Sequence, residues 1–243
     1  MERILLIETS TALCSVALAE DGAVTAYRES SAPKAHASLT AVFVQEILAE
    51  RGTSLAECDA VCVSMGPGSY TGLRVGVSTA KGLCFGAGKP LLAVGTLDTL
   101  VAQAQIPGQA GHEVKYIIPM IDARRMEVYA AVFEVPSPCS SDCDDRTGQA
   151  HQITETAPVI IDETSFAEYL ADGPCLFIGD GAGKCAEILA HPNARFCQCH
   201  PMASAMLSPA VKAYRAGDFK DVAYFEPFYL KEFVATVSKK KLF

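Results

Sequence analysis

Residues 61–76 hold the pattern with the clearest chemical meaning in this sequence. An apolar run at 61–64 leads into a turn with glycines at 66, 68 and 72, and a helix-like segment follows. A strand, a tight loop and a helix in this order place free backbone N–H groups where an anion can bind. The turn lacks the Lys of a Walker loop, because Leu73 follows Gly72, and Thr71 replaces the last glycine of the dinucleotide pattern. The loop therefore has the shape of a nucleotide-binding loop without its catalytic residues.

A second glycine-rich turn, residues 179–184, follows another apolar run and ends with Lys184. Its glycines could cradle a phosphate that Lys184 reaches, which is compatible with a small-molecule kinase or phosphatase. Such an enzyme also needs carboxylates to hold Mg²⁺, and the first hairpin offers little beyond Glu8. We interpret both turns as degenerate nucleotide loops, with these candidate contacts: Thr9, Ser10, Gly66, Gly68, Ser69, Gly179, Gly181 and Gly183.

The ten cysteines and five histidines match no familiar metal site. The histidines are scattered and form neither H-E-x-x-H nor H-x₃-H. Several cysteines lie within apolar runs, where reduced thiols behave as small hydrophobic groups. We expect no metal and no cofactor, although one set could in principle supply zinc ligands at a spacing that fits zinc poorly: Cys139, Cys143, Cys197, Cys199 and His200.

Composition limits the remaining classes. Half of the 243 residues are apolar, which supports a substantial core. The net charge of −8 argues against a protein that grips nucleic acid through its overall field. No apolar run is long enough for a membrane span, and the first residues resemble a strand more than a signal peptide. The expected location is the cytoplasm.

The order of expected elements repeats, which predicts an α/β protein of two lobes. We place the boundary near 107–113, giving an N-terminal lobe at 1–110 with the dimerisation helices and a second lobe at 111–243. The second lobe carries a polar insertion at 136–152, and its C-terminal segment could pack back on the first lobe. The expected strands are 4–8, 14–19, 24–28, 60–64, 91–94, 116–121, 128–135, 159–161 and 176–178, and the expected helices include 33–51, 70–85, 97–105 and 203–216.

Two helices carry more information than the loops. The helix at 70–85 has Gly72, Gly76, Ala80 and Cys84 at four-residue spacing, so one face is almost bare backbone. Mid-helix glycines cost about 1 kcal/mol each relative to alanine, and such a stripe usually marks a surface that another element approaches closely. The helix at 33–51 is apolar on two sides. One side covers a sheet, and the other meets either a neighbouring helix or a partner protein.

Three stretches, residues 6–10, 65–81 and 121–129, resemble the TsaB (YeaZ) family. This family is the bacterial companion of TsaD in making threonylcarbamoyl-adenosine in tRNA. The resemblance covers most of the chain and is weakest at 136–152 and 190–209. It implies the actin-like fold of sugar kinases and the Hsp70 ATPase, with two lobes of duplicated ribonuclease H-like topology.

The resemblance also implies that catalysis is lost. TsaD-like sequences have acidic residues where this chain has Thr11, Ala12 and Leu13. They also carry an H-x₃-H metal cluster, whereas the matching residues 94–100 contain no histidine. Thr and Leu cannot replace imidazole as metal ligands. We therefore expect no catalytic residues.

The implied function is that of a scaffold or activator, which biases TsaD toward a competent state. The expected partners are TsaD in a heterodimer and the ATPase TsaE, with a homodimer when the chain is alone and tRNA contacted only through the complex. An active kinase or phosphatase is the alternative from another class, and a self-sufficient homodimer with a binding role is a third. The basic stretch at 239–241 could touch tRNA or stay solvated. The expected partner interface comprises Leu39, Phe43, Ile47, Tyr70, Leu73, Arg74, Gly76, Val77 and Lys81.

Overall fold

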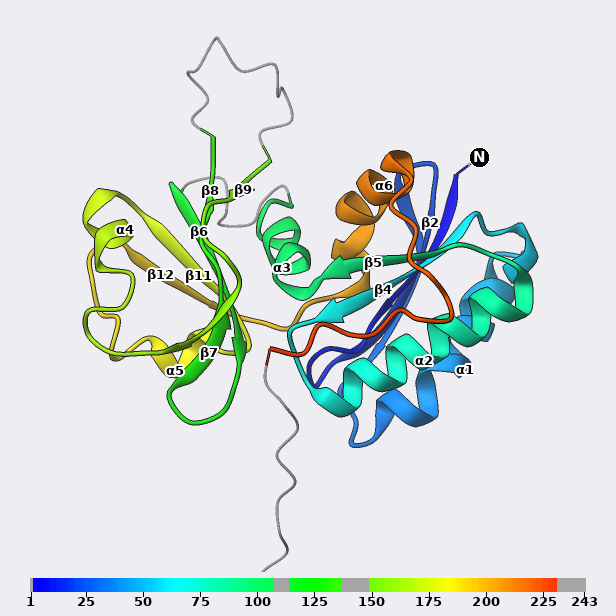
Figure 1. Cartoon of the computed structure of the whole chain (residues 1–243), viewed down its shortest axis with the longest axis horizontal. Helices are drawn as coiled ribbons and strands as arrows, with labels where there is room; N and C mark the ends of the chain where they lie inside the picture. Colours follow the sequence, from blue (N-terminus) through cyan, green and yellow to red (C-terminus); the bar gives the residue numbers. More distant parts are fainter. Residues whose placement is uncertain (1, 107–113, 137–148, 231–243) are drawn as a thin grey trace, which may run out of the picture.

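The computed structural model describes residues 2–106, 114–136 and 149–230, and it consists of two α/β halves (Figure 1). The first half is built on a five-stranded sheet in the order β3-β2-β1-β4-β5. In it β1 pairs antiparallel with β2 and parallel with β4. The strands are β1 Arg3–Glu8, β2 Cys14–Glu20, β3 Ala23–Ser30, β4 Ala60–Gly66 and β5 Leu91–Gly95.

The second half repeats this arrangement, with the order β10-β7-β6-β11-β12. Its central strand β6 pairs antiparallel with β7 and parallel with β11, as β1 does with β2 and β4. The same strand order in both halves is the duplicated ribonuclease H-like topology of the actin-like fold, which confirms the predicted fold class. The strands are β6 Tyr116–Asp122, β7 Glu127–Ala130, β10 Ala157–Ile160, β11 Cys175–Gly179 and β12 Ala194–Gln198, with the short β8 Phe133–Glu134 and β9 His151–Gln152 beside them.

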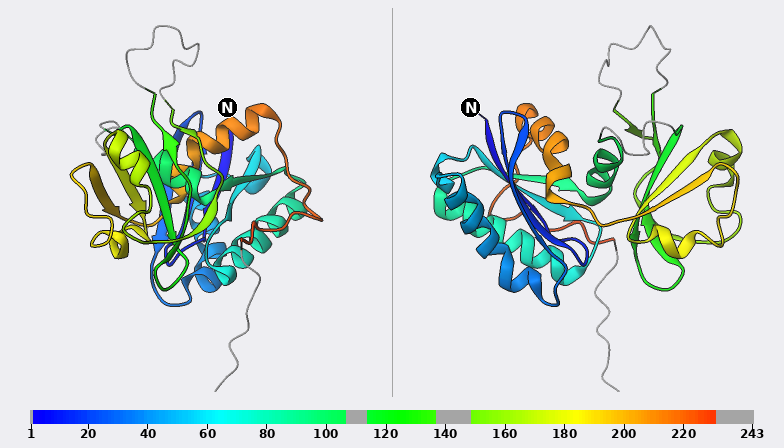
Figure 2. Two further views of the ribbon diagram at one scale, coloured as in Figure 1. Left: turned by 60° about the vertical axis from the view of Figure 1, so that its left-hand side comes forward. Right: turned by 180° about the vertical axis from the view of Figure 1, so that it is seen from behind.

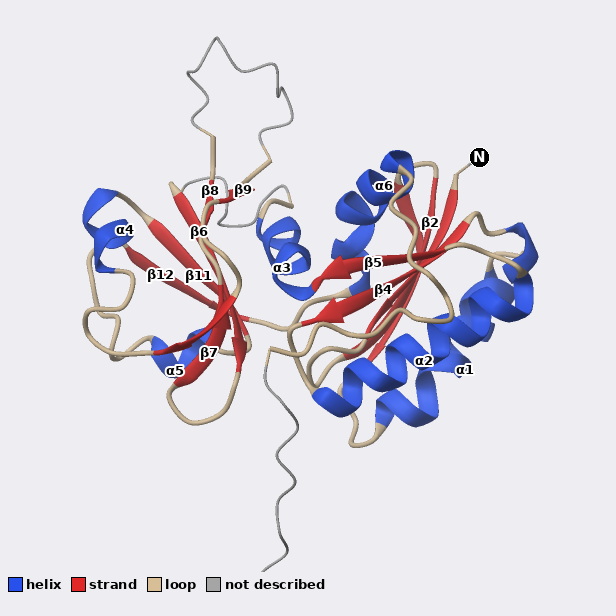
Figure 3. Cartoon of the chain, in the orientation of Figure 1, coloured by secondary structure: helices blue, strands red, loops and turns tan. Residues whose placement is uncertain are grey.

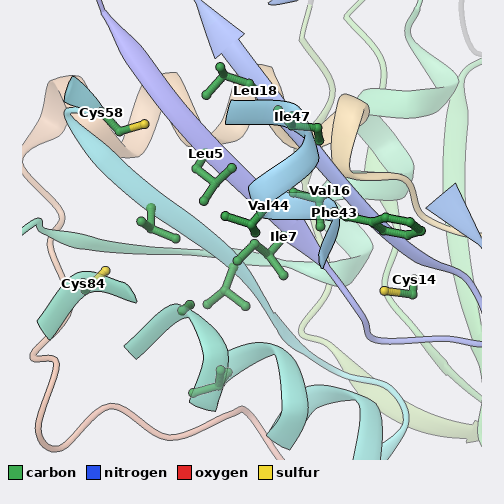
Figure 4. Close-up of a cluster of buried hydrophobic side chains, with 14 of the residues drawn as sticks. Leu5, Ile7, Cys14, Val16, Leu18, Phe43, Val44, Ile47, Cys58 and Cys84 are labelled. Atoms are coloured by element: carbon green, nitrogen blue, oxygen red, sulfur yellow. The ribbon is translucent and has the colours of Figure 1, made fainter. Parts of the chain in front are cut away.

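Helices cover both sheets (Figure 3). Two long helices, α1 Ala35–Glu50 and α2 Tyr70–Ala87, lie side by side against one face of the first sheet. Figure 4 shows Val44 and Ile47 of α1 beside Leu5 and Ile7 of β1, in a cluster that is almost fully buried. The remaining helices are α3 Thr96–Ala104, α4 Ala167–Asp172, α5 Ala182–Cys185 and α6 Leu207–Ala216, with 3₁₀ turns at Leu55–Glu57 and Ala203–Met206.

Two helices cross between the halves. Helix α3 packs Leu97 and Leu100 against Ile117 of the second sheet. Residues 203–216 pack Met206 and Ala210 against the first sheet. Figure 2 shows α3 and α6 between the two sheets. Each half therefore receives its inner helix from the part of the chain that the sequence places in the other half, and the two halves are tied together.

The chain after α6 returns along α2 as a segment without regular helix or strand and with a turn at 222–224; we call residues 218–230 the C-terminal strap. Lys220 N donates to Leu91 O at 2.8 Å, and Phe228 N donates to Met65 O at 2.7 Å. Lys81 of α2 donates through Nζ to the carbonyls of Ala223 and Phe225, at 3.1 and 3.0 Å. These backbone contacts join the end of the described chain to the first glycine-rich loop.

Several predicted elements differ in detail from the structure. The strand expected at 128–135 is divided into β7 and β8. Strand β12 and helix α4 were not among the expected elements, and the second glycine-rich turn runs into α5, a helix of only four residues that overlaps it. The expected boundary at 107–113, most of the insertion at 136–152, Cys139, Cys143 and the basic stretch at 239–241 lie outside the described residues. Across the described ranges, no helix combines the length and apolar character of a membrane span.

Candidate functional site

The first glycine-rich loop lies against the end of β1. A Cβ at Gly68 would stand 2.3 Å from Ser10 O, and one at Gly72 would stand 2.1 Å from Thr9 O. Ser69 caps α2, since its Oγ accepts from Gly72 N at 3.3 Å, and its own N–H donates to Ser10 O at 2.6 Å. The glycines are thus explained by the close approach of two backbones, which leaves no room for a side chain.

The glycine stripe of α2 continues this contact. A Cβ at Gly76 would stand 2.1 Å from Thr9 Oγ1 and 3.4 Å from a methyl group of Val63. Ala80 and Cys84 are buried in the core of the first half. The inclusion of Gly76 in the expected partner interface is therefore wrong: the stripe faces the sheet, and its small residues allow α2 to lie close to β1 and β4.

The predicted interface residues divide into two groups, and the larger one is buried in the core of the isolated chain. This group comprises Phe43, Ile47, Leu73, Gly76 and Val77, whose assignment to a partner surface is therefore wrong. The sequence pattern located apolar faces of α1 and α2, but it could not tell which face the sheet covers.

The other four residues lie nearer the surface. Leu39 is partly buried against the core, and Lys81 is held by the strap. The Tyr70 ring packs on Tyr229 of the strap, with ring centres 4.8 Å apart. Arg74 is exposed and donates through its guanidinium to the Tyr70 hydroxyl at 3.1 Å.

The opposite side of α2 is exposed and almost uncharged. Phe85 is 85% exposed, and Cβ atoms placed at Gly82 and Gly86 would meet nothing within 4 Å. On the neighbouring α1, Val42 is 40% exposed. We call this surface the outer face and define it by the exposed residues Val42, Arg74, Ser78, Gly82, Phe85 and Gly86.

A buried polar corner follows β1. The Glu8 side chain is fully buried, its Oε1 accepts from Ser10 N at 2.6 Å, and burial raises the pKa of its carboxyl. Glu8 Oε2, Thr9 Oγ1 and Thr11 Oγ1 have no hydrogen-bond partner within the described part of the chain. A carboxyl buried in this way is poorly suited to hold a divalent cation at the surface of a cleft.

The raised pKa of Glu8 gives a prediction for stability against pH. The carboxyl of a free glutamate has a pKa of about 4.3. Burial raises the pKa of Glu8 in the native protein, so the native carboxyl holds its proton more tightly than the unfolded chain does. The free energy of unfolding should therefore fall as pH rises above the unfolded pKa, until the native carboxyl has ionised. Glu8→Gln cannot ionise and should flatten this fall, measured by urea unfolding between pH 5 and 8. Parallel profiles for the wild type and Glu8→Gln, with exposed Glu187→Gln as control, would contradict this assignment.

The second glycine-rich turn is also determined by close backbone contacts. Gly179 has φ +130, and a Cβ there would stand 2.2 Å from Met120 O. Gly183 N donates to Gln198 Oε1 at 2.6 Å, and Gln198 Nε2 donates to Asp180 O at 2.9 Å. Burial raises the pKa of Asp180, whose Oδ1 accepts from Asp122 N at 2.9 Å. The turn is a structural junction between β11, β6 and β12.

Lys184 is not free to reach a phosphate. Its Nζ forms an ion pair with Asp122 and donates to the carbonyls of Arg125 and Glu127, at 2.8 and 2.7 Å. These three acceptors match the three protons of an ammonium group. The suggestion that Lys184 contacts a phosphate is therefore not supported by its contacts.

The two turns face a common space between the halves, the interlobe cleft, with a volume of about 630 Å³. Ser10, Ser69 and Tyr70 line it from the first half, and Asp180 and Arg124 from the second. Phe228 and Tyr229 of the strap form another wall. The start of α2 offers N–H groups to an anion here, but the described residues around the cleft supply neither a free lysine nor a built carboxylate site for a divalent cation.

Metal binding receives no support from the described ranges either. No three His, Cys, Asp or Glu side chains there lie close enough together to hold a metal ion. Cys197 and Cys199 stand two residues apart at the end of β12 and pack beside the core under α3. Burial raises the pKa of Cys199 to about 12, which keeps this thiol protonated near neutral pH.

Comparison with known proteins places the chain in a family. The family model described as "TsaD: tRNA N6-adenosine threonylcarbamoyltransferase" matches residues 29–237. The "tRNA threonylcarbamoyladenosine biosynthesis protein TsaB" of Escherichia coli is 42% identical over 132 residues, 54% of this chain and 55% of that protein. The chain thus aligns with about half the length of the first curated relatives, since the match to the Haemophilus influenzae protein of the same name covers 51% of it.

Two further matches are a curated transferase and a solved structure. The "tRNA N6-adenosine threonylcarbamoyltransferase" of Maricaulis maris is 43% identical, but over 28% of this chain and 18% of that protein. A crystal structure titled "an uncharacterized protein with similarity to peptidase YEAZ from Pseudomonas aeruginosa" superposes with a TM-score of 0.80 at 27% identity, covering 95% of this chain and all of that one. The chain belongs to the TsaB (YeaZ) family, which is related to TsaD.

Proposed function

We propose that this protein is a non-catalytic subunit that pairs with a TsaD-type transferase in the formation of threonylcarbamoyladenosine in tRNA. The observation that carries the proposal is the outer face of a TsaB-family chain, an exposed surface of α2 that carries one charge, Arg74, and from which Phe85 stands out. Exposed apolar patches on soluble proteins often mark interaction sites, so a partner is the natural explanation of this surface.

The chemistry of the interlobe cleft supports a role without catalysis. Phosphoryl transfer needs positioned cations or metal ions that stabilise the moving charge. Here Lys184 is held by Asp122 and two carbonyls, and Glu8 is buried. The cleft and its two turns favour a kinase or phosphatase, but neither Lys184 nor Glu8 is placed to do this work.

The outer face suits a helix of a partner. Ser78, Gly82 and Gly86 follow one another at four-residue spacing, and space is open above both glycines, so a second helix can approach their backbone closely. Phe85 lies beside this row of small residues and supplies apolar area for burial. Arg74 at one end can pair with an acidic group. The same surface would join two copies of this chain when the transferase is absent.

The remaining parts of the proposal follow from this pairing. TsaD carries the transfer chemistry, the ATPase TsaE completes the complex, and this chain stabilises the competent arrangement of TsaD by binding it more tightly than the incompetent one. With a net charge of −8, the chain contacts tRNA only through the complex, in the cytoplasm.

The isolated protein should neither hydrolyse ATP nor modify tRNA, with or without Mg²⁺ or Zn²⁺. Phosphate release and mass spectrometry of tRNA nucleosides measure the two activities. Turnover that depends on the metal and falls in Arg124→Gln, an exposed residue of the cleft, would favour the kinase or phosphatase alternative instead. Turnover unaffected by that substitution would point to a contaminant.

A further inference from the structure

A second cavity, of about 690 Å³, lies between α3 and α6 and shares no lining residue with the interlobe cleft. Its volume falls within the range of sites that hold one small molecule. Val94, Val101 and Phe133 provide apolar wall, from β5, α3 and β8. The cavity is therefore large enough for a ligand with an apolar body.

Two opposite charges in this cavity are not committed to other side chains. Lys220 is paired with Asp218, and Gln149 Nε2 donates to Ser208 Oγ at 2.8 Å. In contrast, neither Asp98 on α3 nor Lys212 on α6 forms a hydrogen bond or ion pair with the side chain of another described residue. An acid and a base thus stand on the two helices that enclose the cavity, each able to pair with a charge of a ligand.

The position of Asp98 is fixed by its surroundings. A Cβ at Gly95 would stand 2.2 Å from Asp98 Oδ2, so the carboxylate lies across a residue that has no side chain. The backbone angles of Gly95, φ −63 and ψ 140, are open to any residue. Glycine is needed there because a side chain would occupy the space of the Asp98 carboxylate. Asp98 stays accessible at the cavity wall, while the elements packed around its carboxyl raise its pKa, a shift that the charge of Lys212 opposes only in part. The ammonium group of a ligand, placed beside the Asp98 carboxylate, would compensate its negative charge more fully than Lys212 does.

We propose that this cavity binds a zwitterionic small molecule, an apolar amino acid or a short apolar peptide. Its ammonium group pairs with Asp98, its carboxylate pairs with Lys212, and its apolar body lies against Val94, Val101 and Phe133. A ligand with a single charge pairs with either Asp98 or Lys212 and leaves the other residue without a counter-charge. The cavity therefore prefers a zwitterion.

Isothermal titration of the whole chain tests the proposal with three probes of equal carbon skeleton: L-leucine, leucinamide with the ammonium alone, and 4-methylpentanoate with the carboxylate alone. We expect saturable binding of leucine and at least about tenfold weaker binding of either singly charged analogue, since a hydrogen-bonded ion pair is lost in each case. Asp98→Asn and Lys212→Gln should each weaken leucine about tenfold or more, while Lys89→Gln, outside the cavity, should not.

The variants should melt near the wild-type temperature. If Asp98→Asn disturbs the start of α3, Lys212→Gln still tests the proposal, because Lys212 is exposed on α6 and its substitution should leave the fold intact. Leucinamide should retain its affinity in Lys212→Gln, and 4-methylpentanoate should retain its affinity in Asp98→Asn. The absence of saturable binding of both leucine and leucyl-leucine at millimolar concentrations would overturn the proposal. Equal affinity of leucine for the wild type and both cavity variants would overturn it as well.

Discussion

Gly76→Leu should destabilise the isolated protein strongly, whereas Gly82→Leu on the same helix should not. A Cβ at position 76 would already stand 2.1 Å from Thr9 Oγ1, and Thr9 is fully buried. Forcing a larger side chain into a packed core costs about 1–3 kcal/mol and often more. At position 82 a Cβ meets nothing within 4 Å, and replacing a mid-helix glycine gains up to ~1 kcal/mol of helix propensity.

Urea unfolding of the two variants and the wild type measures this difference directly. Both substitutions replace glycine by leucine within α2, so helix propensity changes alike and the surroundings of each site decide the result. A Gly76→Leu protein as stable as Gly82→Leu would mean that the stripe does not face the sheet. The partner interface would then have to be assigned to the stripe and not to the outer face.

Phe85→Asp on the outer face should weaken association severely while leaving the fold intact. The substitution removes the largest apolar side chain of the surface proposed to be buried by a helix of the transferase, and it puts an unpaired charge there. A central apolar anchor of an interface is worth about 2 kcal/mol or more, so we expect affinity to fall at least about thirtyfold. Phe85 is 85% exposed in the monomer, so the melting temperature of the variant should stay near that of the wild type when both are compared at concentrations low enough to keep them monomeric.

The matched control is Ile160→Asp. Ile160 on β10 is 74% exposed, so it offers the same change of an exposed apolar residue to a charge, in the other half of the molecule. Analytical ultracentrifugation or a titration with the purified transferase should show wild-type affinity for this variant. Equal losses for Ile160→Asp and Phe85→Asp would mean that added charge, not the location, weakens the complex.

The fold was more accessible from the sequence than the interface was. Alternating apolar runs and turn residues predicted most strands, and the repeated order predicted two similar halves. Strand β12 is a five-residue strand at the sheet edge with no fully buried residue and no apolar alternation, so its signal is weak and it was missed. The strap forms no regular helix or strand, and backbone hydrogen bonds together with Val222, Phe225 and Tyr229 hold it, a pattern without helical or strand periodicity.

The candidate site shows the same limit at the level of single residues. The glycines at 72 and 76 correctly signalled a close approach, but spacing alone does not say which element approaches. That element is the backbone and side chain of Thr9, far earlier in the chain. Likewise, Lys184 after a glycine-rich turn suggests a phosphate contact, and only the fold shows that Asp122 and two carbonyls hold it.

The central claim is that this chain acts by binding a TsaD-type transferase through the outer face and does no chemistry itself. The most direct test is formation of threonylcarbamoyladenosine in tRNA by the purified transferase and TsaE of the same organism. The reaction is run without this chain, and with the wild type, Phe85→Asp or Ile160→Asp, each supplied near the wild-type dissociation constant. We expect modification with the wild type and Ile160→Asp, and little or none in the other two reactions. Full modification without this chain, or with Phe85→Asp, would contradict the account.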